Sequence, residues 1–420
     1  MSATVFSAFL SSLVAGSMSD RWGRRVTIIL ASAIFSAGSL WLAWAGGPWS
    51  LLAGRLMVGA GVGLASHTVP IYISECSTTD QRGHLLTMNN IAITGGQLVA
   101  ALTCGLFSEV ASGWRWMLGL AVVPALVQLL GFLAMPETPR YLVSRNRMEE
   151  AERELSSLRG QHHPLRDEIE DMVVASRAGA GQASWRSILS SRAARMSIML
   201  GCLLQATQQL AGINTVMYYS ASILVMAGLP SSTSIWLASL TSGINFLFCV
   251  FGMIIISRLT RRTILFTSIT FVTLSLISIS ISFQFISPSN SSSLGPIMAL
   301  VSLCLYLASF SPGLGTLPWV INSEVHPGWC RASAMSLATG TNWATNLLVS
   351  ATFLSLVDRL GRPATFLLYA GLTAGGGGVL AWLLPETRGV SLEETETLFS
   401  SRQSGISDAD RSRYSLISEE

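Results

Sequence analysis

The sequence predicts an all-α polytopic membrane protein built from two similar helix bundles. Three observations support this fold class: the balance of apolar and charged residues, a series of long apolar windows, and an internal repeat of short motifs. Half of the 420 residues are hydrophobic and 12% are charged, whereas soluble domains carry about 25% charged residues. A chain with so few charges needs lipid around most of its length. The net charge of +3 is small and gives no indication of nucleic-acid binding.

Eleven apolar windows are long enough to cross a bilayer as helices. A hydrocarbon core of about 30 Å requires about 20 residues at about 1.5 Å each. In chain order the windows cover residues 2–19, 26–45, 49–72, 88–108, 115–135, 196–227, 233–257, 264–286, 296–321, 332–357 and 364–384. We therefore expect eleven transmembrane helices.

Two polar segments divide the chain. Residues 136–195 are rich in Arg and Glu, and their stretch 148–159 reads as a solvated amphipathic helix. The second polar segment follows the last apolar window. We therefore expect an N-terminal bundle (1–135), a linker with short amphipathic helices (136–195), a C-terminal bundle (196–384) and a tail (385–420).

The basic residues predict the orientation in the membrane. One set of alternate loops holds the arginines of the linker together with Arg21, Arg24, Arg25, Arg82, Arg258, Arg261, Arg262 and Arg331, whereas the opposite set holds Arg115, Arg359 and Arg362. The positive-inside rule therefore places the linker and the C-terminus in the cytoplasm. We expect the plasma membrane, with an endosomal pool because Tyr414-Ser415-Leu416-Ile417 fits a tyrosine-based endocytic pattern.

An internal repeat relates the two bundles. The pair Glu75 and Arg82 recurs as Glu324 and Arg331, and Pro136-Glu137-Thr138 recurs as Pro385-Glu386-Thr387, both at a spacing of 249 residues. Residues 20–25 have a weaker echo in residues 257–262. Two similar bundles related by an axis along the membrane normal are typical of transporters that hold the substrate between the halves. Because five windows precede the linker and six follow it, we expect one further helix upstream of Met1.

The motifs resemble those of the sugar-porter family of the major facilitator superfamily. They occur in the family's order, namely Asp20-Arg21-Trp22-Gly23-Arg24-Arg25, Gly54-Arg55, Pro70 with Glu75 and Arg82-Gly83, Pro136-Glu137-Thr138-Pro139-Arg140, Gln208-Gln209-x-x-Gly212-Ile213-Asn214, Pro318-Trp319, Asn342-Trp343 and Pro385-Glu386-Thr387-Arg388. Within the family, residues 93–97, 212–220 and 311–324 are most similar to the proton–myo-inositol cotransporters. The resemblance implies a major-facilitator fold of twelve helices, of which the first is missing here.

The resemblance also implies which residues bind the substrate. Residues matching the family's sugar site are Asn90, Gln97, Gln208, Gln209, Asn214, Asn245, Phe310 and Trp319, and residues matching its outer gate are Tyr218 and Tyr219. Asn90 stands where the family usually has Gln. Ser311 stands where the family has Glu, and this departure favours the inositol branch over hexose carriers. An aromatic belt at the membrane interface is the competing interpretation of the two tyrosines.

The chemistry of these side chains fits a neutral polyol. Asn and Gln both donate and accept hydrogen bonds without a net charge, and Gln208, Gln209 and Asn214 lie close together in one apolar window. Buried amides are costly in lipid unless they are satisfied, so their density indicates the interior of a bundle. Hydrogen bonding between helices is the alternative. Trp319 could offer its face to the C–H surface of a polyol or simply pack in the core. Gly212 would let its helix unwind, as the moving gates of transporters do.

Charged residues recur at the predicted cytoplasmic helix ends of both halves. We expect an ion-pair network that closes this side and breaks on opening, formed by Asp20, Arg24, Arg25, Glu75, Arg82, Glu137, Arg258, Arg262, Glu324, Arg331 and Glu386. Partly exposed pairs contribute only about 0–1 kcal/mol each, which suits a bistable element. The positive-inside rule alone accounts for the arginines but not for the acidic residues that recur with them.

Arg55 is the one basic residue predicted to lie inside a span, roughly 9 Å from its outer end at about 1.5 Å per residue. The side chain could snorkel to the interface. The resemblance instead implies an acidic partner on the missing first helix, and so a role in proton coupling. Asn290 begins a glycosylation sequon. The six cysteines show no metal or disulfide spacing, and we expect no metal and no cofactor.

The sequence thus predicts a monomeric transporter in the lipid bilayer and not an enzyme. We expect it to move myo-inositol or a related polyol by alternating access, coupled to protons in the complete protein. A facilitative hexose transporter is the alternative on the same fold, and a non-transporting sensor or an inactive truncated isoform is the alternative of another class.

Overall fold

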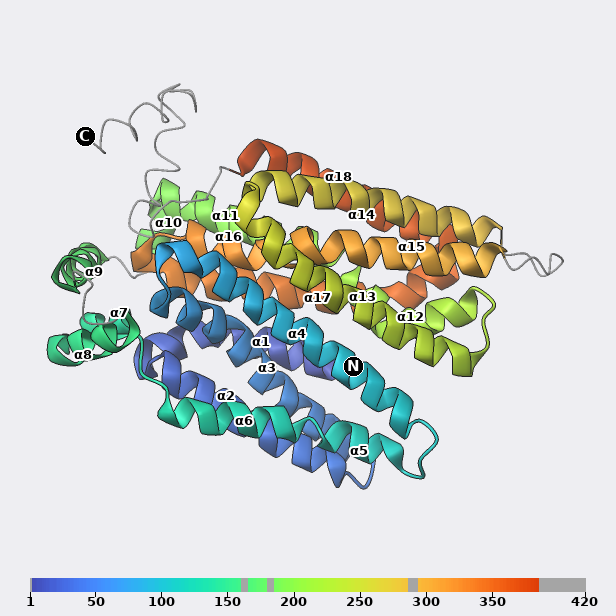
Figure 1. Ribbon diagram of the computed structural model, residues 1–420, viewed down its shortest axis with the longest axis horizontal. Coiled ribbons are helices and arrows are strands. Elements are labelled where there is room, and N and C mark those ends of the chain that lie inside the picture. The colour runs from blue at the N-terminus through green and yellow to red at the C-terminus, as the bar shows by residue number, and fades with distance from the viewer. Residues whose placement is uncertain (1, 160–164, 180–184, 286–293, 385–420) are drawn as a thin grey trace.

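The computed structural model describes residues 2–159, 165–179, 185–285 and 294–384, and every regular element in these ranges is a helix (Figure 1). Two bundles lie side by side: α1 to α6, in blue to cyan, and α11 to α18, in green to red. The four helices between them lie at one end of the bundles, which we call the linker side. The all-α prediction is therefore confirmed.

The first bundle begins with three long helices joined by short turns. Its elements are α1 (Ser2–Trp22), α2 (Arg24–Ala43), α3 (Pro48–Cys76), α4 (Thr79–Phe107), α5 (Gly113–Gly119) and α6 (Val122–Ala134). Gly23 separates α1 from α2 with φ of 94°, which favours glycine. A Cβ atom there would lie 2.2 Å from Oε2 of Glu137. The turn and the approach of Glu137 therefore both require glycine.

The linker forms four short helices: α7 (Pro139–Ser144), α8 (Met148–Arg159), α9 (Leu165–Gly179) and α10 (Trp185–Ser190). Helix α8 confirms the amphipathic helix predicted over 148–159. Its apolar face contributes Ala151 and Leu155 to a small core shared with α7 and α9. Arg159 anchors α8 to the bundle, because it donates to the carbonyls of Cys76 and Ser77 at 2.7 and 3.3 Å and pairs with Glu168 at 2.8 Å.

The second bundle contains the largest apolar core among the described residues. Its elements are α11 (Arg192–Leu210), α12 (Ile213–Met226), α13 (Ser231–Arg258), α14 (Arg261–Gln284), α15 (Leu294–Phe310), the π-helical segment η1 (Ser311–Gly315), α16 (Leu317–Val325), the short 3₁₀ segment η2 (Gly328–Cys330), α17 (Arg331–Leu360) and α18 (Arg362–Leu383). Across the interface between the bundles, α1 packs on α17 and α4 packs on α13.

Three predicted spans are interrupted rather than continuous. The window 115–135 is divided into α5 and α6, and 296–321 contains η1 between α15 and α16. The window 196–227 is divided at Gly212, whose φ of 82° lies in the left-handed region. The break predicted at Gly212 is confirmed. The π-helical segment was not predicted, although such segments often mark functional sites.

All eleven predicted windows are helical, but their ends differ. On the linker side, α1 continues past its apolar window to Trp22 and α3 continues past its window to Cys76. Helix α4 begins at Thr79, before its apolar window starts. Hydropathy detects only the apolar part of a helix that emerges from lipid. Within the described residues, nine segments combine the length and composition of a membrane span. The remaining two windows are the divided 196–227 and the polar α17.

Candidate functional site

A cavity of about 500 Å³ lies between the two bundles. Helices α2, α3, α4 and α6 line it from one bundle, and α11 to α13, α15 to α17 and η1 line it from the other. All eight residues predicted to bind the substrate line this cavity, namely Asn90, Gln97, Gln208, Gln209, Asn214, Asn245, Phe310 and Trp319. Asn90 and Trp319, 229 positions apart in the chain, are thus brought to one space.

The amides of the second bundle form a continuous hydrogen-bond chain along the cavity wall. Gln208 donates its Nε2 to two carbonyls of η1 at 2.9 and 2.8 Å and accepts from Asn342 Nδ2 at 2.9 Å. Gln209 donates to Asn342 Oδ1 at 3.0 Å and accepts from Asn214. Gln208, Gln209 and Asn342 are therefore each paired with another amide or with the backbone, which offsets the cost of burying them, whereas Nε2 of the neighbouring Gln205 has no partner in the described ranges.

The facing wall joins the two bundles. Asn245 on α13 donates to Gln97 Oε1 on α4 at 3.2 Å and accepts from the Ser311 hydroxyl at 2.5 Å. Asn90, seven residues before Gln97 on α4, donates to Thr316 Oγ1 at 2.7 Å. Asn90 and Gln97 of α4 are thus both engaged across the interface.

The two tyrosines predicted as a gate are directed differently. Tyr218 lines the cavity. Tyr219 does not, because its hydroxyl donates to the Ser350 carbonyl at 3.3 Å and its ring packs on Phe353 with the centroids 5.1 Å apart. Within α12, Tyr218 thus faces the cavity, whereas Tyr219 faces α17.

The residue-by-residue prediction missed several polar residues that also line the cavity: Asn89, Gln128, Asn342, Trp343 and Asn346. Asn342 and Asn346 stand four positions apart in an apolar window, a spacing that places both on one face of a helix. This periodicity was the signal that could have identified them.

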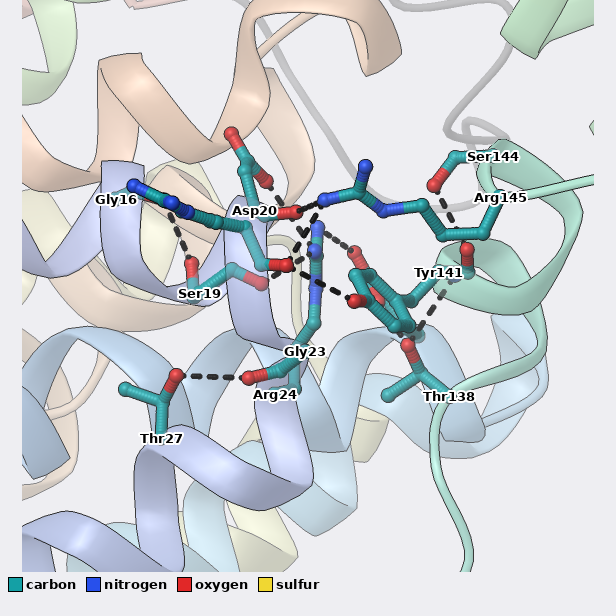
Figure 2. Close-up of polar contacts among 12 residues, drawn as sticks. Gly16, Ser19, Asp20, Gly23, Arg24, Thr27, Thr138, Tyr141, Ser144 and Arg145 are labelled. Carbon is teal, nitrogen blue, oxygen red and sulfur yellow. Dashed lines mark hydrogen bonds and ion pairs between the residues drawn. The ribbon is translucent and has the colours of Figure 1, made fainter.

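The N-terminal half of the predicted ion-pair network is present on the linker side. Arg24 lies between Asp20, at 3.2 Å, and Glu75, at 3.1 Å, and Figure 2 shows its guanidinium beside the Tyr141 ring. Arg145 donates to the carbonyl of Asp20 at 2.6 Å from α7. The end of α1 is therefore held by α2, α3 and the linker together.

Glu137 belongs to the same cluster of charged residues on the linker side. Its carboxylate accepts from the backbone N–H groups of Arg24 and Arg25 at 3.1 to 3.2 Å and from that of Thr138 at 2.9 Å. Burial raises the pKa of Glu137 above its ordinary value, although these N–H donors act in the opposite direction. Glu75 in turn accepts from the Thr138 hydroxyl at 2.6 Å.

The C-terminal half differs from the prediction in its arginine. Glu324 is paired with Arg261, at 3.0 and 2.8 Å, and not with Arg262, which donates to the Ala381 carbonyl at 2.8 Å. Arg25 is likewise turned to the carbonyls of Phe132 and Leu133. The side chains of these two arginines thus donate to backbone carbonyls of a neighbouring helix in their own bundle.

The remaining predicted residues are placed as follows. Arg82 and Arg331 are buried and donate to the carbonyls of Ser74 and His326 at 3.3 and 3.1 Å, whereas Arg258 is exposed at the end of α13. Glu386 and Asn290 lie outside the described residues. Arg55 is partly buried in α3, and no side chain in the described ranges pairs with it. Those ranges also hold no cluster of metal-ligating side chains.

Comparison with known proteins defines the class. The chain matches the family of sugar (and other) transporters over residues 1–399 and belongs to it. Members of this family are membrane transporters, so the chain is a multi-pass membrane transporter and not an enzyme.

Relatives of known activity include inositol and sugar carriers. The proton myo-inositol cotransporter of Homo sapiens is 37% identical, over 99% of this chain and 78% of its own length. Myo-inositol transporter 1 of Cryptococcus neoformans is 35% identical, over 95% and 73%. The arabinose-proton symporter of Escherichia coli K12 is 32% identical, over 94% and 84%.

Solved structures show the major-facilitator fold. The proton:xylose symporter XylE bound to 6-bromo-6-deoxy-D-glucose superposes with a TM-score of 0.85, at 25% identity over 94% of this chain and 88% of XylE. The inward-open conformation of XylE from E. coli superposes with a TM-score of 0.72, at 25% identity over 94% and 88%. The predicted fold class is therefore confirmed.

Proposed function

We propose that this transporter moves myo-inositol or a closely related neutral polyol. The observation that carries the proposal is the cavity between the bundles, which amides line from both sides and whose lining, among the residues that the structure describes, holds no carboxylate or basic group. A polyol loses water from many hydroxyls when it binds, and each hydroxyl needs a partner that donates or accepts. Amides do both without attracting ions. The relatives named as inositol transporters support the same substrate class.

The hydrogen bonds of the cavity wall suggest how its amides change partners when a polyol binds. The amides Gln208, Gln209 and Asn342 are hydrogen-bonded to one another along the cavity wall. Hydroxyls of a bound polyol would replace some of these bonds one for one, so binding leaves few polar groups unpaired. Phe310 and Trp319 supply apolar surface for the C–H faces. The selectivity then comes from the spacing of the amides.

Alternating access follows from the two-bundle architecture. On the linker side, which we propose is cytoplasmic in the plasma membrane, the Arg24–Glu75 and Arg261–Glu324 pairs are intact. The higher TM-score with ligand-bound XylE than with inward-open XylE agrees with a linker side that is closed. Opening would separate these charged ends, while Tyr218 acts on the opposite side of the cavity.

Coupling to protons is the finer part of the proposal. Relatives named as proton symporters support it. Arg55 is the residue we assign to coupling, because it is a partly buried cation inside a span with no acid beside it in the described ranges. Such intramembrane charges are costly and mark ion pathways. We propose that the chain works as a monomer.

A hexose carrier is the second candidate, because XylE holds a bromo-deoxyglucose on the same fold. Uptake of labelled myo-inositol into proteoliposomes tests the two. We expect saturable inositol uptake that excess glucose does not inhibit and that an inward proton gradient (pH 5.5 outside, 7.5 inside) accelerates. Strong competition by glucose supports the hexose carrier, and absence of any uptake contradicts transport by this chain. Equal rates with and without the gradient exclude proton coupling.

A further inference from the structure

Helix α4 is hydrogen-bonded to the second bundle at two positions along its length, which we call levels. Gln97 contacts Asn245 at 3.2 Å, and Asn90 contacts Thr316 at 2.7 Å. Seven residues separate Gln97 from Asn90, which corresponds to about 10 Å along a helix. Because α4 begins on the linker side at Thr79, Asn90 marks the level nearer that side.

The amide nitrogen of Asn90 is fully used across the interface. It donates to Thr316 Oγ1 at 2.7 Å and approaches Cys249 Sγ at 3.2 Å. Both partners belong to the second bundle and are buried, with exposed fractions of 2% for Thr316 and 0% for Cys249. An amide nitrogen has two hydrogens, so both donors of Asn90 are directed at the second bundle while these contacts hold, and its oxygen is the group that can still accept.

A chain of hydrogen bonds connects the two levels through the π-helical segment. Thr316 Oγ1 accepts from Asn90 and donates to the Ser311 carbonyl at 3.0 Å. The Ser311 hydroxyl donates to Asn245 Oδ1 at 2.5 Å, and Asn245 contacts Gln97. Bonds that share groups in this way strengthen one another. Because π-helical turns are rare and often mark functional sites, we take η1 to be the part of this chain that yields.

We propose that Asn90 and Thr316 form a latch that keeps the linker side of the cavity closed, so that Asn90 acts as a positioning residue. Opening the linker side separates α4 from α13 and α16, and therefore breaks this contact. A second part rests on the proposed function. A polyol that hydrogen-bonds to Asn245 displaces Gln97 and Ser311 from it, which loosens η1 and weakens the latch.

Cys249 is a natural reporter of this latch, because it is buried beside Asn90 when the latch is closed. The full chain, with all its cysteines, is treated from the linker side with a small water-soluble alkylating reagent in inside-out vesicles. Mass spectrometry then measures the rate at which Cys249 is modified. No ligand is needed, so the result does not depend on the substrate.

The informative variants change a single group. Thr316→Val removes the hydroxyl at nearly constant shape, and we expect about three- to tenfold faster modification of Cys249, the effect of one hydrogen bond. Thr316→Ser keeps the hydroxyl, so Cys249 should be modified at the same rate as in the parent protein. Thr103→Val is the matched control on α4, because the Thr103 hydroxyl donates only to the Val99 carbonyl of its own helix. An unchanged rate in Thr316→Val overturns the latch.

Transport kinetics separate a latch from a substrate ligand. We expect Thr316→Val to change the maximal rate of inositol uptake and to leave its KM within about twofold. A KM that rises several-fold in Asn90→Ala, with Thr316→Val normal in rate and KM, overturns the latch and makes Asn90 a ligand. Inositol should also accelerate modification of Cys249 in the parent protein. Failure of that acceleration alone removes the second part and leaves the ligand-free result standing.

Discussion

Arg261 donates two parallel hydrogen bonds to Glu324, from Nε at 3.0 Å and from Nη2 at 2.8 Å. The pair is the counterpart of Arg24 and Glu75 in the other bundle, which are 3.1 Å apart. Glu75 and Glu324 are equivalent positions of the sequence repeat, and both arginines stand at the start of the helix that follows a short turn. Each bundle thus has one buried ion pair at the same place on the linker side.

Breaking the Arg261–Glu324 pair is expected to destabilise the protein. Both side chains are at most 10% exposed, and removing one partner of a buried pair leaves an uncompensated charge, at about 3–5 kcal/mol. We expect Glu324→Gln to lower the thermal midpoint in detergent and to reduce transport several-fold. Glu150→Gln is the control, because its pair with Arg147 is half exposed and such pairs contribute about 0–1 kcal/mol. Equal midpoints for both variants contradict the assignment.

Gln208 is expected to determine affinity for the polyol. Gln208→Ala removes an amide that donates to two carbonyls of η1 and accepts from Asn342. Each buried group left unpaired costs about 1–3 kcal/mol, so inositol uptake should fall at least several-fold at constant surface expression. Gln284→Ala, on the exposed end of α14, should leave uptake unchanged. Normal uptake in Gln208→Ala removes this residue from the site.

His67 and His326 are expected to respond in opposite ways to the same replacement. Both are fully buried, but neither ring nitrogen of His67 makes a well-formed hydrogen bond in the described part of the chain, where the Met335 backbone is its polar neighbour. His326 contacts Ser197 and Asn322, each at 3.2 Å. His67→Met should raise the thermal midpoint, since an unsatisfied buried group costs about 1–3 kcal/mol. His326→Met should lower it by leaving its partners unpaired. A fall in both variants would show that His67 has a polar partner.

Tyr218 and Tyr219 are expected to have separate roles. Tyr218→Ala should raise the KM for inositol, because its side chain lines the cavity. Tyr219→Ala should instead lower the thermal midpoint, since it loses the packing on Phe353 and the bond to Ser350. Uptake assays and thermal unfolding of the two variants check this division. Equal changes of KM in both would support the paired gate that the sequence suggested.

The sequence by itself determined the fold class and the composition of the site. Hydropathy identifies apolar spans because the bilayer excludes unpaired backbone, and this located helices such as α2 and α14 to within a few residues. The amides Gln208, Gln209 and Asn245 stood out because polar groups are rare in such spans. Gly212 stood out in the same way as a break. These signals are local in the chain.

Only the tertiary structure decided which side chains meet. The sequence could not distinguish Arg261 from Arg262 as the partner of Glu324, or Tyr218 from Tyr219 at the cavity, because each pair is adjacent in the chain. Adjacent helical residues point about 100° apart, so the packing of neighbouring helices selects one of them. The engagement of Asn90 with Thr316, 226 residues away, depends in the same way on how α4 lies against the second bundle.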